Sequence, residues 1–343
     1  MTMQLPGEQL VTRLWATVDK AVSGMLRPWQ IQREASVRLQ SREREMLVIA
    51  QTERDVEDIR AGRKKVIQDG ASIRLLPGAA EMVEGRAEPL LDLQALLTDA
   101  AGTRAINLLQ EEINVAKTIL KAEAVLMDDP AEPPSTFAEP DWLCRWRSCA
   151  SQMSSDELQT LFAKVLAGEI KAPGRFSLRT LDFLKNLSRD EAERMQFVCP
   201  FIANGRYVFM YGPMQTPHAY HDNPEFPFFL QELGLLAGNG YMGNVLQKFA
   251  SESKTAFRAV LRFNDRAIIV RGPDPSAILE LHGFKATPVG AQALSLCLLP
   301  APDGYVQAVA AHCKSKGFDV AVAARRAHPD GAEGGELFDE VAI

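Results

Sequence analysis

One pair of histidines in the sequence has a spacing that suits a metal ion. His218 and His221 are three residues apart and Asp222 follows directly, so a turn of helix would bring both imidazoles to one side. Pro217 and Pro224 flank the pair, and the nearby sequence holds no third nitrogen or sulfur ligand. A surface loop is therefore favoured over a zinc site, and we predict no metal and no cofactor.

A glycine-rich segment at 234–243 is similar in composition to loops that bind phosphate. Such loops follow a strand directly and carry a lysine that reaches the phosphate groups. The segment has no lysine in that position, and no predicted strand leads directly into it. A plain loop, or the entry to a β-hairpin wing, is the favoured interpretation.

Polar residues gather in the part of the chain that is richest in helix caps and turns, between residues 141 and 188. Glu169, Arg179 and Thr180 lie on either side of a Pro-Gly turn. One interpretation is contact with a ligand or partner, and the other, which we favour, is an ion pair between Glu169 and Arg179 that holds the turn. Neighbouring basic residues could still form a patch for phosphate or an acidic partner. The candidate contact residues are Glu169, Lys171, Arg175, Arg179 and Thr180.

Three motifs in this region form a recognisable pattern: Asp-Trp at 141–142, SSDELQ at 154–159 and LAGEIKAPGRFSLRTL at 166–181. The residues that carry it are Asp141, Trp142, Gly168, Glu169, Pro173, Gly174, Phe176, Ser177, Arg179, Thr180 and Leu181. The pattern resembles an uncharacterised bacterial family that looks related to the Abi-alpha group, helical proteins associated with abortive infection. The resemblance covers roughly residues 104–197 and departs from the family at Arg175, where a small polar residue is expected. It implies phage defence as the setting and implies no chemistry.

The composition is that of an ordinary globular protein, with 343 residues of which 46% are hydrophobic and 24% charged. A net charge of −6 argues against a globally basic nucleic-acid binder. Residues 1–7 lack a basic segment followed by an apolar run, and no stretch approaches the ~18 apolar residues that a membrane span needs. We expect a cytoplasmic protein whose five scattered cysteines are reduced.

Two helices are predicted at the N-terminal end. Residues 8–26 place apolar side chains at helical spacing, and the charges on the polar face cancel. A membrane-surface helix usually presents a basic polar face, so packing against protein is favoured and lipid contact is the alternative. Residues 27–65 follow as one long helix, whose narrow apolar seam predicts self-association or docking on a partner. The seam residues are Leu39, Met46, Ile49 and Val56.

Further helices are expected at 90–100, 103–127, 142–153, 158–166 and 178–187, and from 189 to 197. Helix caps are expected at Asp141, at Ser154 with Glu157, at Ser177, and at Ser188 with Glu191. Gly168 is expected to end the helix 158–166 in the left-handed conformation.

From residue 201 onwards the pattern changes to mixed helix and strand. Strands are expected at 207–211, 260–263, 267–270 and 318–324, and helices at 226–236, 288–298 and 303–316. The second and third strands read as a hairpin around Asn264-Asp265. Thr287 is expected to cap a helix that has no basic residue, which counts against nucleic-acid recognition.

The predicted fold class is mostly α with an α+β C-terminal part. It comprises long N-terminal helices, a central helical signature domain and a winged-helix-like C-terminal module. The expected segments are 1–69 (amphipathic and long charged helices), 70–140 (helical connector), 141–200 (signature domain), 201–326 (α+β domain) and 327–343 (flexible acidic tail).

The favoured function is a non-enzymatic interaction protein of bacterial anti-phage defence, which senses or recruits a protein partner or associates with itself. The first alternative is a nucleic-acid-binding winged-helix regulator or effector, which the acidic composition makes less favoured. The second is a lipid- or membrane-associated defence effector that uses the 8–26 helix.

Overall fold

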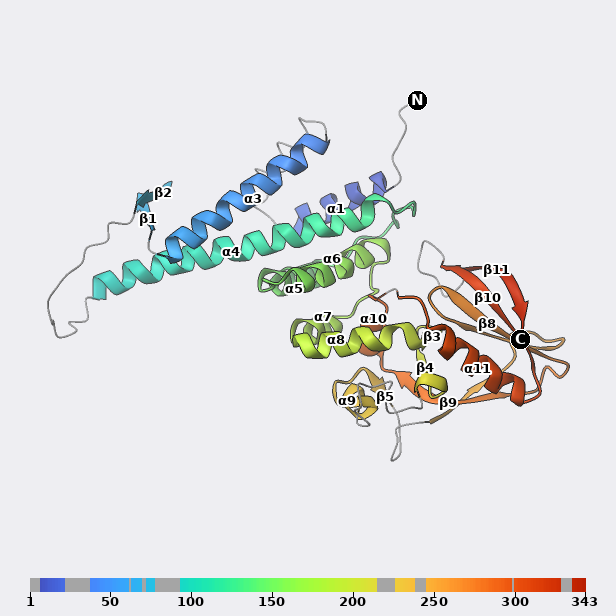
Figure 1. Ribbon diagram of the computed structural model, residues 1–343. Helices are drawn as coiled ribbons and strands as arrows, with labels where there is room; N and C mark the ends of the chain where they lie inside the picture. Colours follow the sequence, from blue (N-terminus) through green and yellow to red (C-terminus); the bar gives the residue numbers. More distant parts are fainter. Residues whose placement is uncertain are drawn as a thin grey trace, which may run out of the picture. The chain divides into compact units, whose positions relative to one another are not determined.

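The computed structural model describes most of the chain (Figure 1). The described residues are 7–21, 38–61, 63–69, 72–77, 93–214, 226–237, 245–297, 299–327 and 335–343. The chain divides into two compact units: a helical unit, Met1–Asp128 with Glu132–Ile170, and an α+β unit, Asp129–Ala131 with Lys171–Ile343. The division falls inside the 141–200 segment that the sequence suggests as one domain.

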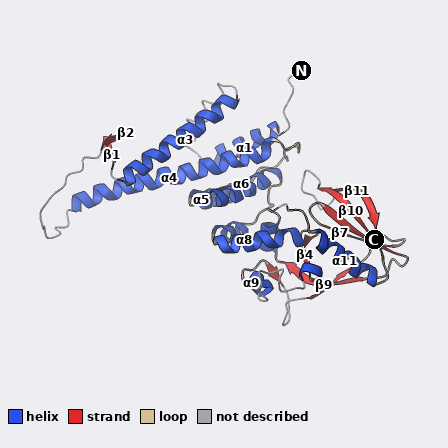
Figure 2. Cartoon of the chain, viewed as in Figure 1, coloured by secondary structure: helices blue, strands red, loops and turns tan. Residues whose placement is uncertain are grey.

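The helical unit is built around one long helix, α4, which contacts α1, α3 and α5 (Figure 1). Its helices are α1 (Glu8–Ala21), α3 (Arg38–Arg60), α4 (Leu93–Met127), α5 (Pro140–Ser151) and α6 (Asp156–Lys171). A small antiparallel hairpin, β1 (Lys64–Asp69) and β2 (Ser72–Pro77), follows α3. Figure 2 shows that helices make up almost all of the regular structure in this unit.

The C-terminal half of α4 is buried on most of its sides. Its buried apolar residues are Ile113, Val115, Ala116, Ile119, Leu120, Ala122 and Leu126. At 100° per residue these positions spread over about half of the helix circumference, and the buried polar residues Asn114 and Thr118 widen the covered arc, so several neighbouring helices are needed to cover it. One of these is α1, whose Leu10, Leu14 and Val18 are at most 2% exposed. The predicted packing of α1 against protein is therefore confirmed.

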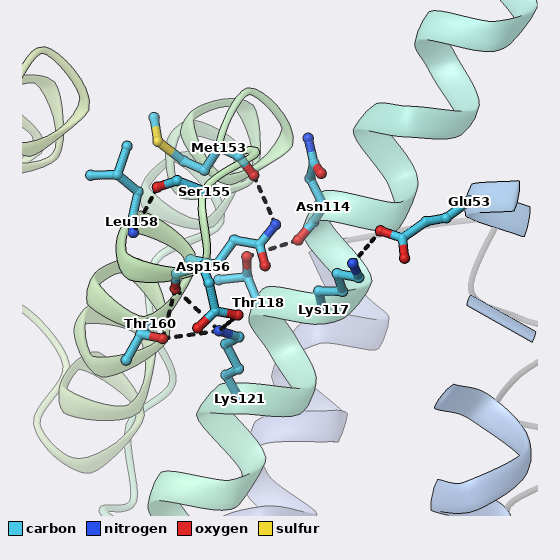
Figure 3. A network of polar contacts seen from close by, with 11 residues as sticks. Glu53, Asn114, Lys117, Thr118, Lys121, Met153, Ser155, Asp156, Leu158 and Thr160 are labelled. Atoms are coloured by element: carbon cyan, nitrogen blue, oxygen red, sulfur yellow. Dashed lines mark hydrogen bonds and ion pairs between the residues drawn. The ribbon is translucent and has the colours of Figure 1, made fainter. Parts of the chain in front are cut away.

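Charged side chains on α4 fix two of its neighbours (Figure 3). Lys117 forms an ion pair with Glu53 of α3. One turn later, Lys121 pairs with the Asp156 carboxylate and donates to the Thr160 hydroxyl at 3.0 Å, both on α6. Partly exposed ion pairs of this kind contribute little energy individually. Their main effect is to set the positions of α3 and α6 along α4.

Trp146 joins α5 to α6. Its side chain is 1% exposed, and its indole N–H donates to the carbonyl oxygen of Phe162 at 3.0 Å. The buried amide of Asn114 on α4 donates to the carbonyl of Ser151, the last residue of α5, at 2.8 Å. A buried tryptophan contributes both a large apolar area and a polar handle, and here both are used.

The starts of α5 and α6 differ from expectation by one or two residues. Helix α5 begins at Pro140, with Glu139 in place of Asp141 at the cap, because proline suits the first helical position. At the start of α6 the hydroxyl of Ser155, rather than Ser154, accepts a hydrogen bond from the N–H of Leu158 at 3.2 Å. The cap predicted at Asp141 is wrong, because Glu139 occupies the cap position and its side chain makes no cap hydrogen bond. At α6 a serine cap is present one residue later than predicted.

The predicted helix end at Gly168 is wrong. Helix α6 continues through Gly168 to Lys171, and the left-handed glycine of this region is Gly174, with φ of 85°. Val165, Leu166 and the two residues around Gly168 are buried, so packing of this helix favours its continuation over a break.

Two expectations for the long helices are also corrected. The helix predicted at 27–65 ends at Arg60, and Lys64 belongs to strand β1, while residues 22–37 lie outside the described part. The helices predicted at 90–100 and 103–127 form the single helix α4. A glycine inside a helix costs only about 1 kcal/mol relative to alanine, so Gly102 does not interrupt it.

The α+β unit contains two antiparallel sheets. Strand orders are β3-β4-β9-β5, with β6 also paired to β9, and β11-β10-β8-β7. The strands are β3 (Ile202–Ala203), β4 (Tyr207–Phe209), β5 (Leu236–Ala237), β6 (Val245–Phe249), β7 (Phe257–Arg262), β8 (Arg266–Gly272), β9 (Leu279–Ala286), β10 (Asp319–Ala327) and β11 (Gly335–Ala342). The helices are α7 (Leu178–Lys185), α8 (Arg189–Val198), α9 (Phe226–Glu232), α10 (Pro288–Leu294) and α11 (Asp303–Ser315), with short 3-10 turns η1 (Cys199–Phe201) and η2 (Gly212–Met214).

Tyr305 of α11 stands at the centre of the α+β unit. It is fully buried, and its hydroxyl accepts a hydrogen bond from the backbone N–H of Phe209 in β4 at 2.8 Å. Its ring packs edge-on against Phe201 and Phe263, with ring centroids 5.0 and 5.8 Å away. One side chain thus links the helix, the strand β4 and the β7–β8 hairpin.

The fold class, mostly α with an α+β C-terminal part, is confirmed. The β7–β8 hairpin pairs as predicted, with Arg262 opposite Ala267. Both sheets are larger than the single wing expected of a winged-helix-like module. The expectation of a flexible tail at 327–343 is wrong in part, because residues 335–342 form strand β11, which pairs with β10.

We predict that Trp146→Ala destabilises the helical unit by about 3–5 kcal/mol, the usual cost of emptying a large buried aromatic site. Denaturant unfolding followed by far-ultraviolet circular dichroism would measure the loss. Val125→Ala is a matched control, because Val125 is 46% exposed in the same unit and the change should stay within about 0.5 kcal/mol. Equal losses in the two variants would contradict the assignment of Trp146 to the core.

Candidate functional site

The turn between α6 and α7 is held by backbone geometry and by one serine. The N–H of Arg175 donates to the carbonyl of Ala172 at 3.1 Å, and Gly174 has the positive φ. Ser177 then caps α7, since its hydroxyl oxygen accepts a hydrogen bond from the N–H of Thr180 at 3.2 Å. This cap was predicted from the sequence and is confirmed.

Thr180, a candidate contact residue, is fully buried. Its hydroxyl bonds to the side-chain carbonyl of Gln292 on α10, and the same oxygen accepts from the N–H of Ser177 at 2.9 Å. Gln292, from a distant part of the chain, is therefore hydrogen-bonded to both residues of the α7 cap. The sequence holds no local signal for this residue, and Thr180 has a structural explanation.

The three basic candidate contact residues differ in how far they are exposed. Lys171 pairs with Asp129 at 2.5 Å, and both side chains are about one-fifth exposed, at 18% and 20%. Arg175 lies 5.5 Å from the ring centre of Phe176 and is half-buried. Of the predicted basic contact residues only Arg179 is exposed.

Glu169 is 1% exposed and lies in the helical unit, whereas Arg179 is exposed and lies in the α+β unit. Burial of a carboxylate requires compensating hydrogen bonds or charge, which favours a structural role for Glu169. Its predicted ion pair with Arg179 stays a prediction.

The predicted seam on α3 is used within the chain. Ile49 and Val56 are 5% and 2% exposed, and α3 packs against α4. The side chains of Leu39 and Met46 lie outside the described part. Leu47, two residues from Ile49 and so about 200° around the helix, is 68% exposed. The inward face of α3 thus has its partner, and an apolar residue remains on the outside.

A second exposed leucine lies on the N-terminal half of α4. Leu108 is 55% exposed, and Arg104 and Glu111 beside it are exposed as well. In Figure 1 this half of α4 runs past the ends of α1, α5 and α6. We use the term helical arm for α3 together with residues 100–112 of α4. The sequence predicted the inward face of the arm and missed its outward leucines.

Three ionisable groups with shifted pKa values lie together in the α+β unit. Tyr211 stacks on His312 of α11 with ring centroids 4.3 Å apart. The Tyr211 hydroxyl accepts a hydrogen bond from the backbone N–H of His282 at 2.9 Å. Burial raises the pKa of Tyr211, and burial with the nearby Lys316 charge lowers the pKa of His312. Burial also raises the pKa of the Cys313 thiol to about 12. At neutral pH all three groups are uncharged, which suits packing better than acid–base work or nucleophilic attack.

Within the described ranges there is no group of three or more His, Cys, Asp or Glu side chains placed to hold a metal ion. The pair His218 and His221, with Asp222, lies outside those ranges, as does most of the glycine-rich segment. The part of that segment that the structure shows is a turn at Gly234 followed by β5. All five cysteines lie in the described part of the chain, and no disulfide joins any of them there.

Comparison with known proteins gives one match. Residues 105–206 match a family described as "Protein of unknown function (DUF2806)". The match runs from within α4 to the residue before β4 and so includes the turn between α6 and α7. Neither a curated protein nor a solved structure matches the chain. Among the described helices, none is long and apolar enough to cross a membrane.

We predict that Gly174→Ala destabilises the protein by about 1–2 kcal/mol, because a side chain is strained at positive φ. A Cβ at this position would meet nothing within 4 Å, so the loss should come from the backbone alone. Gly174→Asn is the matched control and should lose less, since asparagine tolerates the left-handed region. Denaturant midpoints would measure both, and equal losses would contradict the backbone explanation.

We predict that part of the acid sensitivity of the fold comes from His312. Its pKa is lowered in the folded state, so the unfolded chain binds the proton more readily and stability falls as the pH drops below the ordinary histidine pKa of about 6.5. His312→Gln should flatten this part of the curve of unfolding free energy against pH. His282→Gln should flatten it less, because the exposed His282 contributes only the last of the three causes that lower the pKa of His312. Parallel curves for parent and His312→Gln would contradict the prediction.

Proposed function

We propose that this protein is a non-enzymatic interaction protein of bacterial anti-phage defence, that it acts in the cytoplasm, and that it binds a protein partner through its helical arm. The observation that carries the proposal is the pair of outward leucines on the arm, Leu47 and Leu108, at 68% and 55% exposed. Large apolar side chains on an elongated helical surface are typical of helix-mediated recognition.

The arm is suited to binding because its two helices already hold each other. Ile49 and Val56 bury the inward face of α3, and the ion pair between Glu53 and Lys117 sets its position on α4 (Figure 3). A partner would therefore meet a surface that is ordered before binding, which lowers the entropic cost of association.

The defence setting rests on the resemblance to the Abi-alpha group, carried by the motifs between residues 141 and 181. These motifs fall inside the stretch that matches the family of unknown function. Trp142 is buried, Ser177 caps α7 and Gly174 adopts the left-handed turn. The residues behind the resemblance are thus largely structural, which fits a shared fold and implies no common reaction.

The two alternatives have less support. A winged-helix nucleic-acid binder would need a basic recognition helix, whereas α10 carries no charged residue and buries Gly290, Ala293 and Leu294. A lipid-binding role for α1 would need its apolar face, which is packed against protein in the helical unit.

We predict that Leu47→Glu abolishes protection in a phage challenge without changing the melting temperature, because Leu47 is exposed and its loss leaves no cavity. Val125→Glu is the matched control, since Val125 is a 46% exposed apolar residue of the same unit outside the arm. Protection that survives Leu47→Glu would contradict the role of α3 in the arm. A parent protein that protects against no phage in a broad panel would contradict the defence setting.

A further inference from the structure

The N-terminal half of α4 presents one exposed stripe in which charge and apolar character alternate. Ala101, Arg104, Leu108 and Glu111 are all exposed, at spacings of three, four and three residues. This spacing puts them on a single face of the helix. Among the described residues neither Arg104 nor Glu111 forms an ion pair or hydrogen bond, although ion pairs are frequent elsewhere on the helical unit.

The stripe is complementary to itself when a second copy runs antiparallel. Arg104 lies four residues before Leu108 and Glu111 lies three residues after it. A two-fold axis beside Leu108 therefore places the two leucines against each other and each arginine opposite the glutamate of the other copy. Two-fold interfaces require such self-complementary patches, because the same surface contributes from both sides.

We propose that α4 pairs with α4 of a second copy of this chain, antiparallel and across a two-fold axis beside Leu108. The contact has an apolar centre and one Arg104–Glu111 ion pair on each side of it. This inference deepens the proposed function, on which it rests, by naming the partner of the arm as the protein itself.

A second copy fits this stripe better than a parallel arrangement or an unrelated helix. Parallel pairing would set Arg104 against Arg104 and Glu111 against Glu111, and like charges across an interface are repulsive. An unrelated partner would have to supply a leucine between an acidic and a basic residue in reversed order. The chain already carries that pattern.

Light scattering across a concentration series tests the pairing in the full chain. The parent should approach twice the monomer mass as concentration rises, and Leu108→Glu should remain monomeric, because two buried carboxylates would face each other across the axis. Val125→Glu is the matched control and should dimerise like the parent. A monomeric parent at all concentrations, or an undiminished dimer in Leu108→Glu, overturns the proposal.

Charge reversal tests the antiparallel register. Arg104→Glu and Glu111→Arg alone should each weaken dimerisation at least about tenfold, because each creates like-charged pairs across the axis. The double variant, with both changes in one chain, should restore dimerisation to near the parent level. Single variants that dimerise like the parent, or a double variant that is no better than the singles, overturn the antiparallel pairing. Circular dichroism confirms that all variants stay helical.

The outcomes separate this inference from the proposed function. If the parent is monomeric while Leu47→Glu still loses protection, the arm binds another protein and only the inference about the second copy fails. If the dimer forms as described while Leu47→Glu and Leu108→Glu both keep protecting, the pairing stands and the proposed role of the arm in defence fails.

Discussion

The burial of helix α4 is the constraint on which the helical unit depends. Over its C-terminal half α4 carries buried apolar residues on about half of its circumference, and a helix with that pattern is stable in water only when several partners cover it. Helices α1, α3 and α5 supply this cover, and charged residues such as Lys117 and Lys121 set where α3 and α6 lie along it. The N-terminal half has fewer covering partners and keeps Leu108 exposed.

In the α+β unit, contacts between residues that are far apart in the sequence hold the elements together in a comparable way. The hydroxyl of Tyr305 bonds to the backbone of Phe209, and Gln292 bonds to the cap of α7. Each satisfies a polar group that folding would otherwise bury without a partner, which would cost more than the bond itself contributes. Thr180 takes part in the second of these contacts, and this explains its place in the sequence motif without a ligand.

Local signals in the sequence predicted local structure well. The capping box of Ser188 with Glu191, the Ser177 cap and the Thr287 cap are all present, since cap chemistry involves residues three positions apart. Apart from the caps expected at Asp141 and Ser154, most failures concern distant partners. Strand β11 needs β10 to form its ladder, and Gln292 meets Ser177 from 115 residues away. The sequence also placed a helix end at Gly168, because a glycine after a helical stretch resembles a stop signal even where tertiary packing continues the helix.

Burial and internal pairing distinguish residues that stabilise the fold from residues that remain available to contact a partner. Glu169, Lys171 and Thr180 are contact candidates in the sequence because they are polar and close to a turn, and burial or internal pairing accounts for the last two. The sequence alone does not distinguish Leu108, because a leucine in a helix is normally part of the core. The structure shows that its side chain is 55% exposed. An apolar residue that is exposed, between two charges that form no ion pair with any residue the structure describes, is best explained by an association that occurs after folding.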